Sequence, residues 1–326
     1  MKPSLFSGIQ PSGEIHIGNY CGAIRNWVRL IDSYDCIFCV VDYHSLTGVY
    51  DAATMKQRIV DAARVNMACG IDPERAILFV QSHVPEHTEL AWVFSTVTPM
   101  GDLSRMIQFK EKSRQNEDNI NAGLFTYPVL QAADILLYKA TAVPVGEDQI
   151  QHIELTREIA RKFNARFGDL FPEPVHLTPK EGARIMGMDG KSKMSKSLGN
   201  AIGVLEDPDA IWKKLAPALT DENRKRRSDP GNPDICNIFT LHRNFSSADT
   251  VALVDRECRV AGIGCVDCKK MLHQSLVAEL TPIRERAEAL ARQPQRIEEA
   301  LASGAARAQA IAERTMGEVR LALGIR

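Results

Sequence analysis

Buried strands are predicted where short apolar runs recur in the first half of the chain. Four such runs stand at residues 4–10, 36–46, 76–82 and 141–149. Apolar residues at helical spacing occupy 18–33, 53–69 and about 149–167, and Gly70 stands where a helix would stop. Buried strands alternating with helices are typical of a doubly wound parallel sheet, whose ligands bind beyond the carboxyl ends of the strands.

The pattern changes near residue 205. Strand-like runs stop there, and alanine-, leucine- and arginine-rich helical sequence follows, interrupted by "SDPGNPD" at residues 228–234. The predicted fold class is therefore α/β. A doubly wound parallel-sheet domain over residues 1–204 is joined to an all-helical domain over residues 205–326.

Composition limits the partners and the location of the protein. The 326 residues have a net charge of −1, a hydrophobic fraction of 44% and a charged fraction of 25%, which is ordinary for a globular protein. The chain begins with proline, serine and glycine rather than a signal peptide, and no apolar run approaches the ~18 residues of a membrane helix. We therefore expect a cytoplasmic protein with reduced thiols and no membrane partner. Nucleic acid would have to bind at local basic patches, because the chain is not basic overall.

The stretch "QPSGEIHIGNY" (residues 10–20) follows the first predicted strand. Its "PSG" makes a tight turn, and "HIGN" (residues 16–19) opens a helix whose free amides and positive dipole end suit a phosphate. Gly18 lets a nucleotide approach the backbone, and His16 can donate to a phosphate oxygen. Taken alone, the stretch is as compatible with a loop that has a capped helix and a solvated histidine as with a phosphate site.

A second segment, "GKSKMSKSLGN" (residues 190–200), places Lys191, Lys193 and Lys196 in a glycine-flanked loop. Ammonium groups on a mobile loop suit a triphosphate whose negative charge grows in the transition state. A charge run is usually a solvated surface loop, but its pairing with "HIGN" favours nucleotide chemistry.

Together these segments resemble the two signatures of the class I aminoacyl-tRNA synthetases. "HIGN" matches the HIGH signature with Asn19 in place of the final histidine, and "KMSKS" (residues 193–197) matches its signature in every letter. The resemblance implies a Rossmann-like class I synthetase fold and an ATP- and Mg²⁺-dependent ligase, which releases pyrophosphate and passes the acyl group to tRNA. It also implies catalytic roles for His16, Lys193 and Lys196. Nucleotidyltransferases with only the first signature are a distant alternative, because they lack the lysine loop.

The helix predicted over "TYPVLQAADILLY" (residues 126–138) bears on the amino acid substrate. Tyr127, Gln131 and Asp134 lie near one face at i, i+4 and i+7. A buried carboxylate suits a side chain with one hydrogen-bond donor, which describes the indole of tryptophan, although the tyrosine hydroxyl also donates. The Y-x-x-x-Q-x-x-D arrangement itself resembles the tyrosyl enzymes. An amphipathic core helix would show the same pattern, so the residues alone leave these alternatives open.

Longer stretches resemble the bacterial tryptophanyl-tRNA synthetases over almost the whole chain, among them "FSGIQPSGEIHIGNY", "GIDPERAILFVQSHVPEH" and "VPVGEDQIQHIELTREIARKFN". The resemblance implies L-tryptophan, ATP and tRNA(Trp) as substrates, and a homodimer. It implies that Asp134 accepts the indole N–H and that Tyr127 and Gln149 hold the α-amino group. The other residues implied in the tryptophan pocket are Gln131, Phe6, His44, Val143 and Val145. Gln131 replaces the methionine common in the family, which keeps tyrosine as an alternative substrate. The implied ATP contacts are Gln10, Pro11, Ser12, Gly18, Asn19, Gly146, Glu147, Asp148, Ile185, Lys193, Met194, Ser195, Lys196 and Ser197.

Four late cysteines have a spacing compatible with a metal site. Cys236, Cys258, Cys265 and Cys268 form C-x21-C-x6-C-x2-C, and the last two stand in the turn-like stretch "GIGCVDCKK". Free thiols, a structural Zn²⁺ site and a [4Fe–4S] cluster are all open on these residues alone. A subset of bacterial tryptophanyl-tRNA synthetases is similar in binding a [4Fe–4S] cluster through four cysteines so spaced, and this resemblance favours the cluster. Its place in the helical domain of residues 205–326, which the resemblance implies is the anticodon-binding domain, suggests a structural role near the tRNA anticodon, with Lys269 and Lys270 available to phosphates.

The remaining candidates have simpler interpretations. His83, His87 and His152 are predicted to cap helices or face solvent, and "RKRR" (residues 224–227) to be a solvated run or a tRNA phosphate contact. Three other functions compete with a tryptophan–tRNA ligase: a tyrosine–tRNA ligase, a non-catalytic RNA- or nucleotide-binding paralogue, and an iron–sulfur redox sensor.

Overall fold

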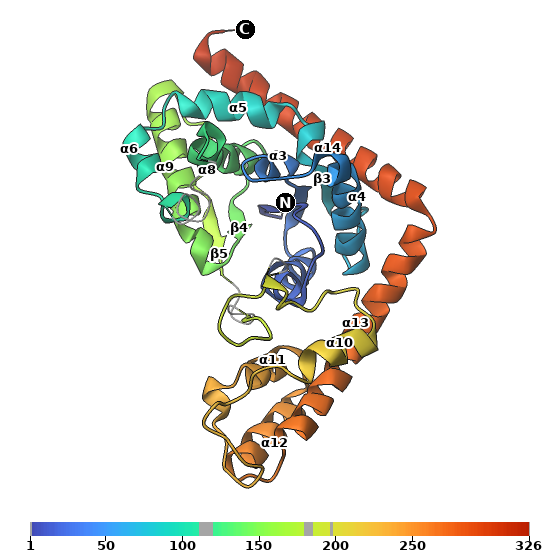
Figure 1. The fold of residues 1–326 in the computed structure, drawn as a ribbon. Helices are drawn as coiled ribbons and strands as arrows, with labels where there is room; N and C mark the ends of the chain where they lie inside the picture. Colours follow the sequence, from blue (N-terminus) through green and yellow to red (C-terminus); the bar gives the residue numbers. More distant parts are fainter. Residues whose placement is uncertain (1, 111–119, 179–184, 196–197, 326) are drawn as a thin grey trace. The chain divides into compact units, whose positions relative to one another are not determined.

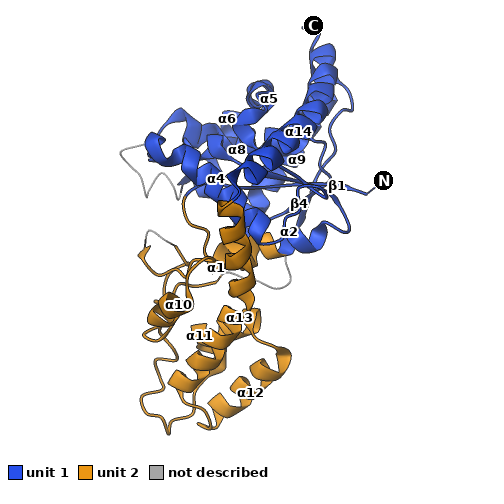
Figure 2. Ribbon diagram, turned by 90° about the vertical axis from the view of Figure 1, so that its right-hand side faces the viewer, with its two compact units in different colours: residues 1–12, 26–179, 293–326 blue, residues 13–25, 180–292 orange. Residues whose placement is uncertain are grey.

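A computed structural model of the chain describes residues 2–110, 120–178, 185–195 and 198–325. The chain forms two compact units, each assembled from separated segments (Figure 2). Unit 1 comprises residues 1–12, 26–179 and 293–326, and unit 2 comprises residues 13–25 and 180–292. The compact units are therefore not continuous in sequence, and the predicted boundary after residue 204 falls within unit 2.

Unit 1 is built on a parallel sheet with the strand order β3-β2-β1-β4-β5 (Figure 1). The strands are β1 (Ser4–Ile9), β2 (Asp35–Val40), β3 (Ile77–Val80), β4 (Ala142–Pro144) and β5 (Val175–Leu177). β1 pairs with β2 on one side and with β4 on the other. The order of the strands therefore reverses beside β1, and ligands of such sheets bind in the crevice at that point, beyond the carboxyl ends of the strands. The predicted doubly wound α/β class is confirmed.

The structure differs from the predicted elements in three places. The apolar run 36–46 is strand only to Val40, because Asp42–Ser45 turns into a short helix, α3. Strand β5 was not predicted, since its three residues are mostly exposed and form no apolar run. The predicted helix 18–33 is a composite of α1 (Ile17–Asn19), a π-helical turn (Tyr20–Ile24) and α2 (Arg25–Leu30).

Helices cover the sheet of unit 1 and are delimited by recognisable caps. Asp51 caps α4 by accepting a hydrogen bond from the amide of Ala53, and Asn121 caps α8 through the amide of Leu124. The main helices of this unit, besides α3, are α4 (Ala52–Ala68), α5 (Glu86–Ser95), α6 (Met100–Ser104), α8 (Ala122–Leu136), α9 (Ile150–Phe167) and α14 (Pro294–Leu323). Single turns of 3₁₀ helix stand at Gln81–His83 and Glu147–Gln149.

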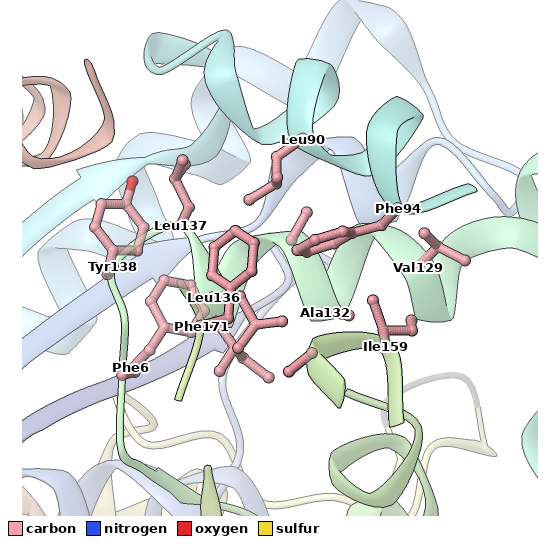
Figure 3. Close-up of a cluster of buried hydrophobic side chains, with 14 of the residues drawn as sticks. Phe6, Leu90, Phe94, Val129, Ala132, Leu136, Leu137, Tyr138, Ile159 and Phe171 are labelled. Atoms are coloured by element: carbon pink, nitrogen blue, oxygen red, sulfur yellow. The ribbon is translucent and has the colours of Figure 1, made fainter. Parts of the chain in front are cut away.

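The core of unit 1 fills the space between the sheet and α5, α8 and α9 (Figure 3). Phe94 of α5 meets Phe163 of α9 edge-on, with ring centroids 6.0 Å apart, and Phe171 at 5.2 Å. Leu136 of α8 is fully buried in the same cluster. Burial of these rings fixes α8 against the sheet, and α8 carries the predicted substrate residues.

Helix α14 belongs to unit 1 although its sequence lies at the end of the chain. It packs against β3 and α4. A Cβ atom added at Gly304 would lie only 1.9 Å from the carbonyl oxygen of Leu78, so the missing side chain permits this close approach. Arg320 adds an ion pair to Glu89 of α5. The helical sequence after residue 293 thus completes the sheet-containing unit.

Unit 2 contains the "HIGN" segment and most of the later helices. They are α10 (Pro208–Leu215), a 3₁₀ turn (Pro233–Ile235), α11 (Asn237–Phe245), α12 (Ala248–Arg259) and α13 (Cys265–Ala291). Asp207 caps α10 and Ser247 caps α12. The expected turn at "GIGCVDCKK" is only half correct, because Gly264 is the N-cap of α13 and Cys265 begins that helix.

Within the described residues, no helix is both long and apolar enough to cross a bilayer.

Candidate active site

A buried carboxylate stands at the carboxyl ends of the strands in unit 1. Asp134 lies on α8 and is 1% exposed. His44 follows β2, and Gln81 follows β3 directly, so both side chains reach the sheet edge where α/β folds bind ligands. Three elements therefore bring their polar groups to one point.

Asp134 is held by hydrogen bonds to both of its oxygens. Its Oδ1 accepts from Gln81 Nε2 at 2.6 Å and lies 2.6 Å from His87 Nδ1, and its Oδ2 lies 2.7 Å from His44 Nε2. Burial alone would raise the pKa of Asp134, but His44 and His87 together lower it below its ordinary value. The carboxylate is therefore ionised at neutral pH and acts as an acceptor in an otherwise apolar surrounding.

The structure brings only part of the predicted tryptophan set to Asp134. His44 contacts it directly, and the ring of Tyr127 meets that of His44 edge-on at 6.3 Å. Phe6 and Val143 are buried on β1 and β4. The others lie in the same unit without a hydrogen bond to Asp134 among the described residues: Gln131 and Val145 are half-buried, and Gln149 donates to Asp148.

Tyr127 has a partner of its own. Its hydroxyl lies 2.8 Å from His152 Nε2, and burial followed by the charge of Asp148 raises the pKa of the phenol above its ordinary value. The hydroxyl therefore keeps its proton. His152 is fully buried, so the prediction that it caps a helix or faces solvent is wrong.

Sequence reasoning missed three residues around the carboxylate: Gln81, His87 and Tyr138. His87 is fully buried and contacts both Asp134 and Tyr138, so its predicted capping or solvated role is wrong. Two signals were present. Gln81 follows a buried strand, as ligand-binding residues of parallel sheets do, and Tyr138 stands four residues after Asp134.

In unit 2, His16 is the N-cap of α1. Its Nδ1 accepts from the amide of Asn19 at 3.3 Å, while the Asn19 side chain accepts from the amide of His16. Burial, followed by the nearby charge of Lys193, lowers the pKa of His16 to about 4. The ring is therefore neutral with its proton on Nε2, which leaves that N–H as a donor. Asn19, where the family signature has histidine, completes this reciprocal cap.

Two side chains, Asn200 and Asp189, hold the lysine loop in place through hydrogen bonds, although neither was predicted as a site residue. Asn200 accepts from the amide of Ser195 at 2.8 Å and donates to Asp189 at 2.9 Å. Asp189 in turn accepts from the amides of Lys191 and Ser192. These bonds, that from Asn200 first, lower the pKa of Asp189. The predicted ATP residues Lys196 and Ser197 lie outside the described residues.

The two signatures are adjacent within unit 2. The amide of Ile17 donates to the carbonyl of Ile202, and the amide of Val204 to that of Ile15, so the "HIGN" segment pairs with the chain just after the lysine loop. A Cβ atom at Gly18 would lie 3.6 Å from Cβ of Met194. The amide of Met194 donates to the carbonyl of Ile185, which joins two further predicted ATP residues.

The remaining predicted ATP residues lie in unit 1. Gln10, Pro11 and Ser12 follow β1, and "GED" (residues 146–148) follows β4 and enters a 3₁₀ turn. Both segments leave the carboxyl ends of adjacent parallel strands. This is the edge at which doubly wound sheets bind nucleotides.

The four late cysteines gather in unit 2 from three helices. Cys236 is the N-cap of α11, Cys258 lies in the last turn of α12, and Cys265 and Cys268 lie in the first turn of α13. Burial and the proximity of the other three raise the pKa of the Cys268 thiol to about 12. Within the described part of the chain, however, no group of three or more His, Cys, Asp or Glu side chains is arranged to hold a metal ion.

Two basic residues beside the cysteines, Arg224 and Lys269, bind groups of the protein itself. Arg224 Nη1 lies 3.9 Å from the sulfur of Cys258 and 3.8 Å from that of Cys265, and its Nη2 donates to the carbonyl of Ile263. Lys269 is buried and donates to the carbonyls of Ala216 and Ala218, each at 2.7 Å. The expectation that Lys269 faces tRNA phosphates is therefore wrong.

Comparison with known proteins agrees with this geometry. The family described as tRNA synthetases class I (W and Y) matches residues 1–281. The chain belongs to this family. It is therefore an aminoacyl-tRNA ligase. The chain is 54% identical to a tryptophan–tRNA ligase of Deinococcus radiodurans, over 98% of both chains. It is 44% identical to a tryptophan–tRNA ligase of Wolinella succinogenes, over 100% of this chain and 99% of the relative.

Solved structures of this family share the fold. Tryptophanyl-tRNA synthetase from Campylobacter jejuni, complexed with ADP and tryptophan, superposes with a TM-score of 0.87 at 35% identity, covering 98% of this chain and 99% of that one. A tyrosyl-tRNA synthetase from Archaeoglobus fulgidus, at 22% identity and a TM-score of 0.71 over 88% of this chain and 90% of that one, has the same fold.

Proposed function

We propose that the chain is a tryptophan–tRNA ligase, which activates L-tryptophan with ATP to tryptophanyl-adenylate and transfers the acyl group to tRNA(Trp). The observation that carries the choice of amino acid is the buried, ionised carboxylate of Asp134. Three of its four acceptor positions are taken by Gln81, His87 and His44. Among the described residues one position remains on Oδ2, which matches the single N–H of an indole.

The pocket residues have distinct proposed roles. Asp134 accepts the indole N–H, and Tyr127 and Gln149 hold the α-amino group. Tyr127 suits this role because its hydroxyl is oriented by His152. The proposed walls around the indole are Phe6, His44, Val143 and Val145, with Gln131 at the half-buried rim.

His16, Lys193 and Lys196 are proposed to act on the triphosphate. The neutral His16 donates from Nε2 to a phosphate oxygen, because Nδ1 is already an acceptor. The lysines bring positive charge to the phosphates as the carboxylate of tryptophan attacks and pyrophosphate departs, and Mg²⁺, typical of the family, accompanies ATP. The proposed ATP contacts are Gln10, Pro11, Ser12, Gly18, Asn19, Gly146, Glu147, Asp148, Ile185, Met194, Ser195 and Ser197. As in the family generally, we expect a homodimer.

Amino-acid-dependent exchange of pyrophosphate into ATP tests this proposal. We expect exchange with tryptophan and little with tyrosine. Asp134→Asn should raise KM for tryptophan by about tenfold or more and leave KM for ATP unchanged, since a hydrogen bond to a charged acceptor is worth about 1.5–3 kcal/mol. Stimulation by tyrosine alone would establish the tyrosine–tRNA ligase that the Tyr127–Gln131–Asp134 pattern suggested, and inactivity with both would favour a non-catalytic paralogue.

We further propose that Cys236, Cys258, Cys265 and Cys268 hold a [4Fe–4S] cluster, with Zn²⁺ as the alternative. Their proximity and the thiolate donor set support this, as does Arg224, whose charge beside two sulfurs would offset an anionic centre. The described arrangement of the thiols is not itself a ligand cage, so binding would draw the sulfurs closer. The cluster would supply a structural cross-link between α11, α12 and α13, because aminoacylation transfers no electrons.

Iron and sulfide analysis of anaerobically purified protein tests the cluster. We expect four iron atoms and four sulfide ions per chain, and the Cys268→Ser variant should lose both. One zinc without sulfide would establish the alternative. A change in tRNA charging with cluster oxidation state, abolished by Cys268→Ser, would support the redox sensor instead.

A further inference from the structure

His87 connects the proposed indole acceptor to a second buried side chain. Its Nδ1 lies 2.6 Å from Asp134 Oδ1, and its Nε2 lies 2.8 Å from the hydroxyl of Tyr138. The ring is fully buried and stacks on Phe79 of β3 at a centroid distance of 5.8 Å. Both nitrogens are thus engaged, and the ring cannot rotate without breaking both contacts.

The hydrogen bonds fix the tautomer of His87. A neutral imidazole has one donor and one acceptor nitrogen. Burial raises the pKa of Tyr138 well above its ordinary value, so its hydroxyl keeps a proton to donate to Nε2. The imidazole proton then stands on Nδ1 and points at the carboxylate of Asp134. The carboxylate can only accept, so it requires the same tautomer, and the tyrosine hydroxyl reinforces that choice by occupying the lone pair on Nε2.

Tyr138 also supports the wall of the pocket. Its ring stacks on that of Phe6, with centroids 5.6 Å apart and planes 7° from parallel (Figure 3). Phe6 lies on β1, whereas Tyr138 follows α8. One side chain therefore orients both the acceptor, through His87, and an aromatic surface proposed to cover the indole.

We propose that His87 and Tyr138 are positioning residues for tryptophan selection, which fix the carboxylate of Asp134 so that its one remaining acceptor position faces the indole N–H. This inference rests on the proposed function, in which Asp134 accepts that N–H. Neither residue touches the substrate. They act by holding the carboxylate in the orientation that meets the indole N–H, so that a ligand without this N–H leaves the buried acceptor unpaired.

The test compares tryptophan with 3-(3-benzothienyl)alanine, in which sulfur replaces the indole N–H. The readout is the ratio of the two kcat/KM values in pyrophosphate exchange. A site built around a buried acceptor should give a wild-type ratio of about 10⁴. His87→Leu should lower it by about ten- to a hundredfold, the worth of one hydrogen bond to a charged group. Tyr138→Phe keeps the stack on Phe6 and should lower it by less.

His87→Asn is the rescue variant. The Asn amide nitrogen can occupy the place of Nδ1 and donate to Asp134, although it cannot reach Tyr138. We expect its ratio to stay within about threefold of wild type, because the donor to the carboxylate is retained. KM for ATP should be unchanged in all three variants.

A matched control separates positioning from general loosening of the core. Thr98→Val removes another buried hydroxyl of unit 1, one that bonds the carbonyl of Phe94 at 2.7 Å. It should lower the thermal midpoint without changing the ratio. If His87→Leu and Tyr138→Phe reduce activity toward both substrates equally, as a structural role predicts, the inference is overturned. If Asp134→Asn also leaves the ratio unchanged, the proposed function of Asp134 fails with it.

Discussion

Replacing Gly304 with alanine tests how closely α14 approaches β3. The added Cβ would stand 1.9 Å from the carbonyl oxygen of Leu78 and 2.7 Å from its carbon, whereas Cβ contacts under 3.0 Å essentially never occur. The obstacle is backbone, so no side chain can swing aside. Helix α14 must instead move about an ångström away from β3, which loosens the packing that completes unit 1.

Two opposing terms determine the effect on the free energy of unfolding. Overpacking of this kind costs about 1–3 kcal/mol, and a rigid backbone obstacle favours the upper end. Alanine is better than glycine in a helix interior by about 0.8–1.0 kcal/mol. We therefore expect Gly304→Ala to lower the free energy of unfolding by about 2 kcal/mol.

Gly317 provides a matched control on the same helix. It is exposed, and a Cβ there would meet nothing within 4 Å. Gly317→Ala should therefore raise the free energy of unfolding by up to about 1 kcal/mol. The difference between the two variants cancels the helix propensity and isolates the packing cost, about 3 kcal/mol.

Urea unfolding combined with hydrogen exchange measures both variants. Gly304→Ala should lower the urea midpoint and speed exchange of the amides of β3, while Gly317→Ala should do neither. Because Gln81 directly follows β3, we also expect a modest rise in KM for tryptophan with Gly304→Ala. Equal stabilisation by the two substitutions would refute the close packing of α14 on β3.

Three further predictions concern unit 2. In an NMR titration, the ring signal of His16 should stay constant as the pH falls through 6.5 and should move only near pH 4. Because the folded pKa lies below the unfolded value, the contribution of His16 to stability is complete above pH 6.5 and declines as the pH falls from 6.5 to 4. A midpoint near 6.5 would contradict the burial of the ring. Asn200→Ala should lower kcat of activation by about tenfold through loss of the loop's hydrogen bonds, leaving KM for tryptophan unchanged; stopped-flow kinetics would reveal whether tryptophan binding changes instead. Lys269→Met should cost about 1–3 kcal/mol in thermal unfolding, because one buried and one partly buried carbonyl lose their donor, and an unchanged melting curve would exclude these bonds.

The sequence predicted those features that depend on local patterns. Four of the five strands lie in largely apolar runs, and the first signature opens a helix after the first strand, as predicted. Strand β5 escaped prediction because only its pairing with β4 makes it a strand. The end of the second strand was placed too late, because α3 begins within the same apolar run.

The network around Asp134 could be predicted only in part. Helical spacing relates Asp134 to residues of its own helix, but Gln81 and His87 reach it from segments about 50 residues earlier. A histidine near a helix start looks like a cap in sequence. Its burial follows from the packing of α5 on α8, which pairs two elements distant in the chain.

The run "RKRR" at residues 224–227 illustrates how charge patterns divide in three dimensions. Arg224 and Arg227 donate to the carbonyls of residues 261–263 and so hold the loop that leads to Cys265. Lys225, Arg226 and Arg227 are exposed, whereas Arg224 is half-buried. Half of a motif that in sequence suggests tRNA phosphates is thus used to order the cysteine region, because a planar guanidinium can satisfy several carbonyls at once. Arg224 is the half-buried member of this run, so any phosphate contact falls to Lys225, Arg226 and Arg227, and its salt dependence should reflect three charges rather than four.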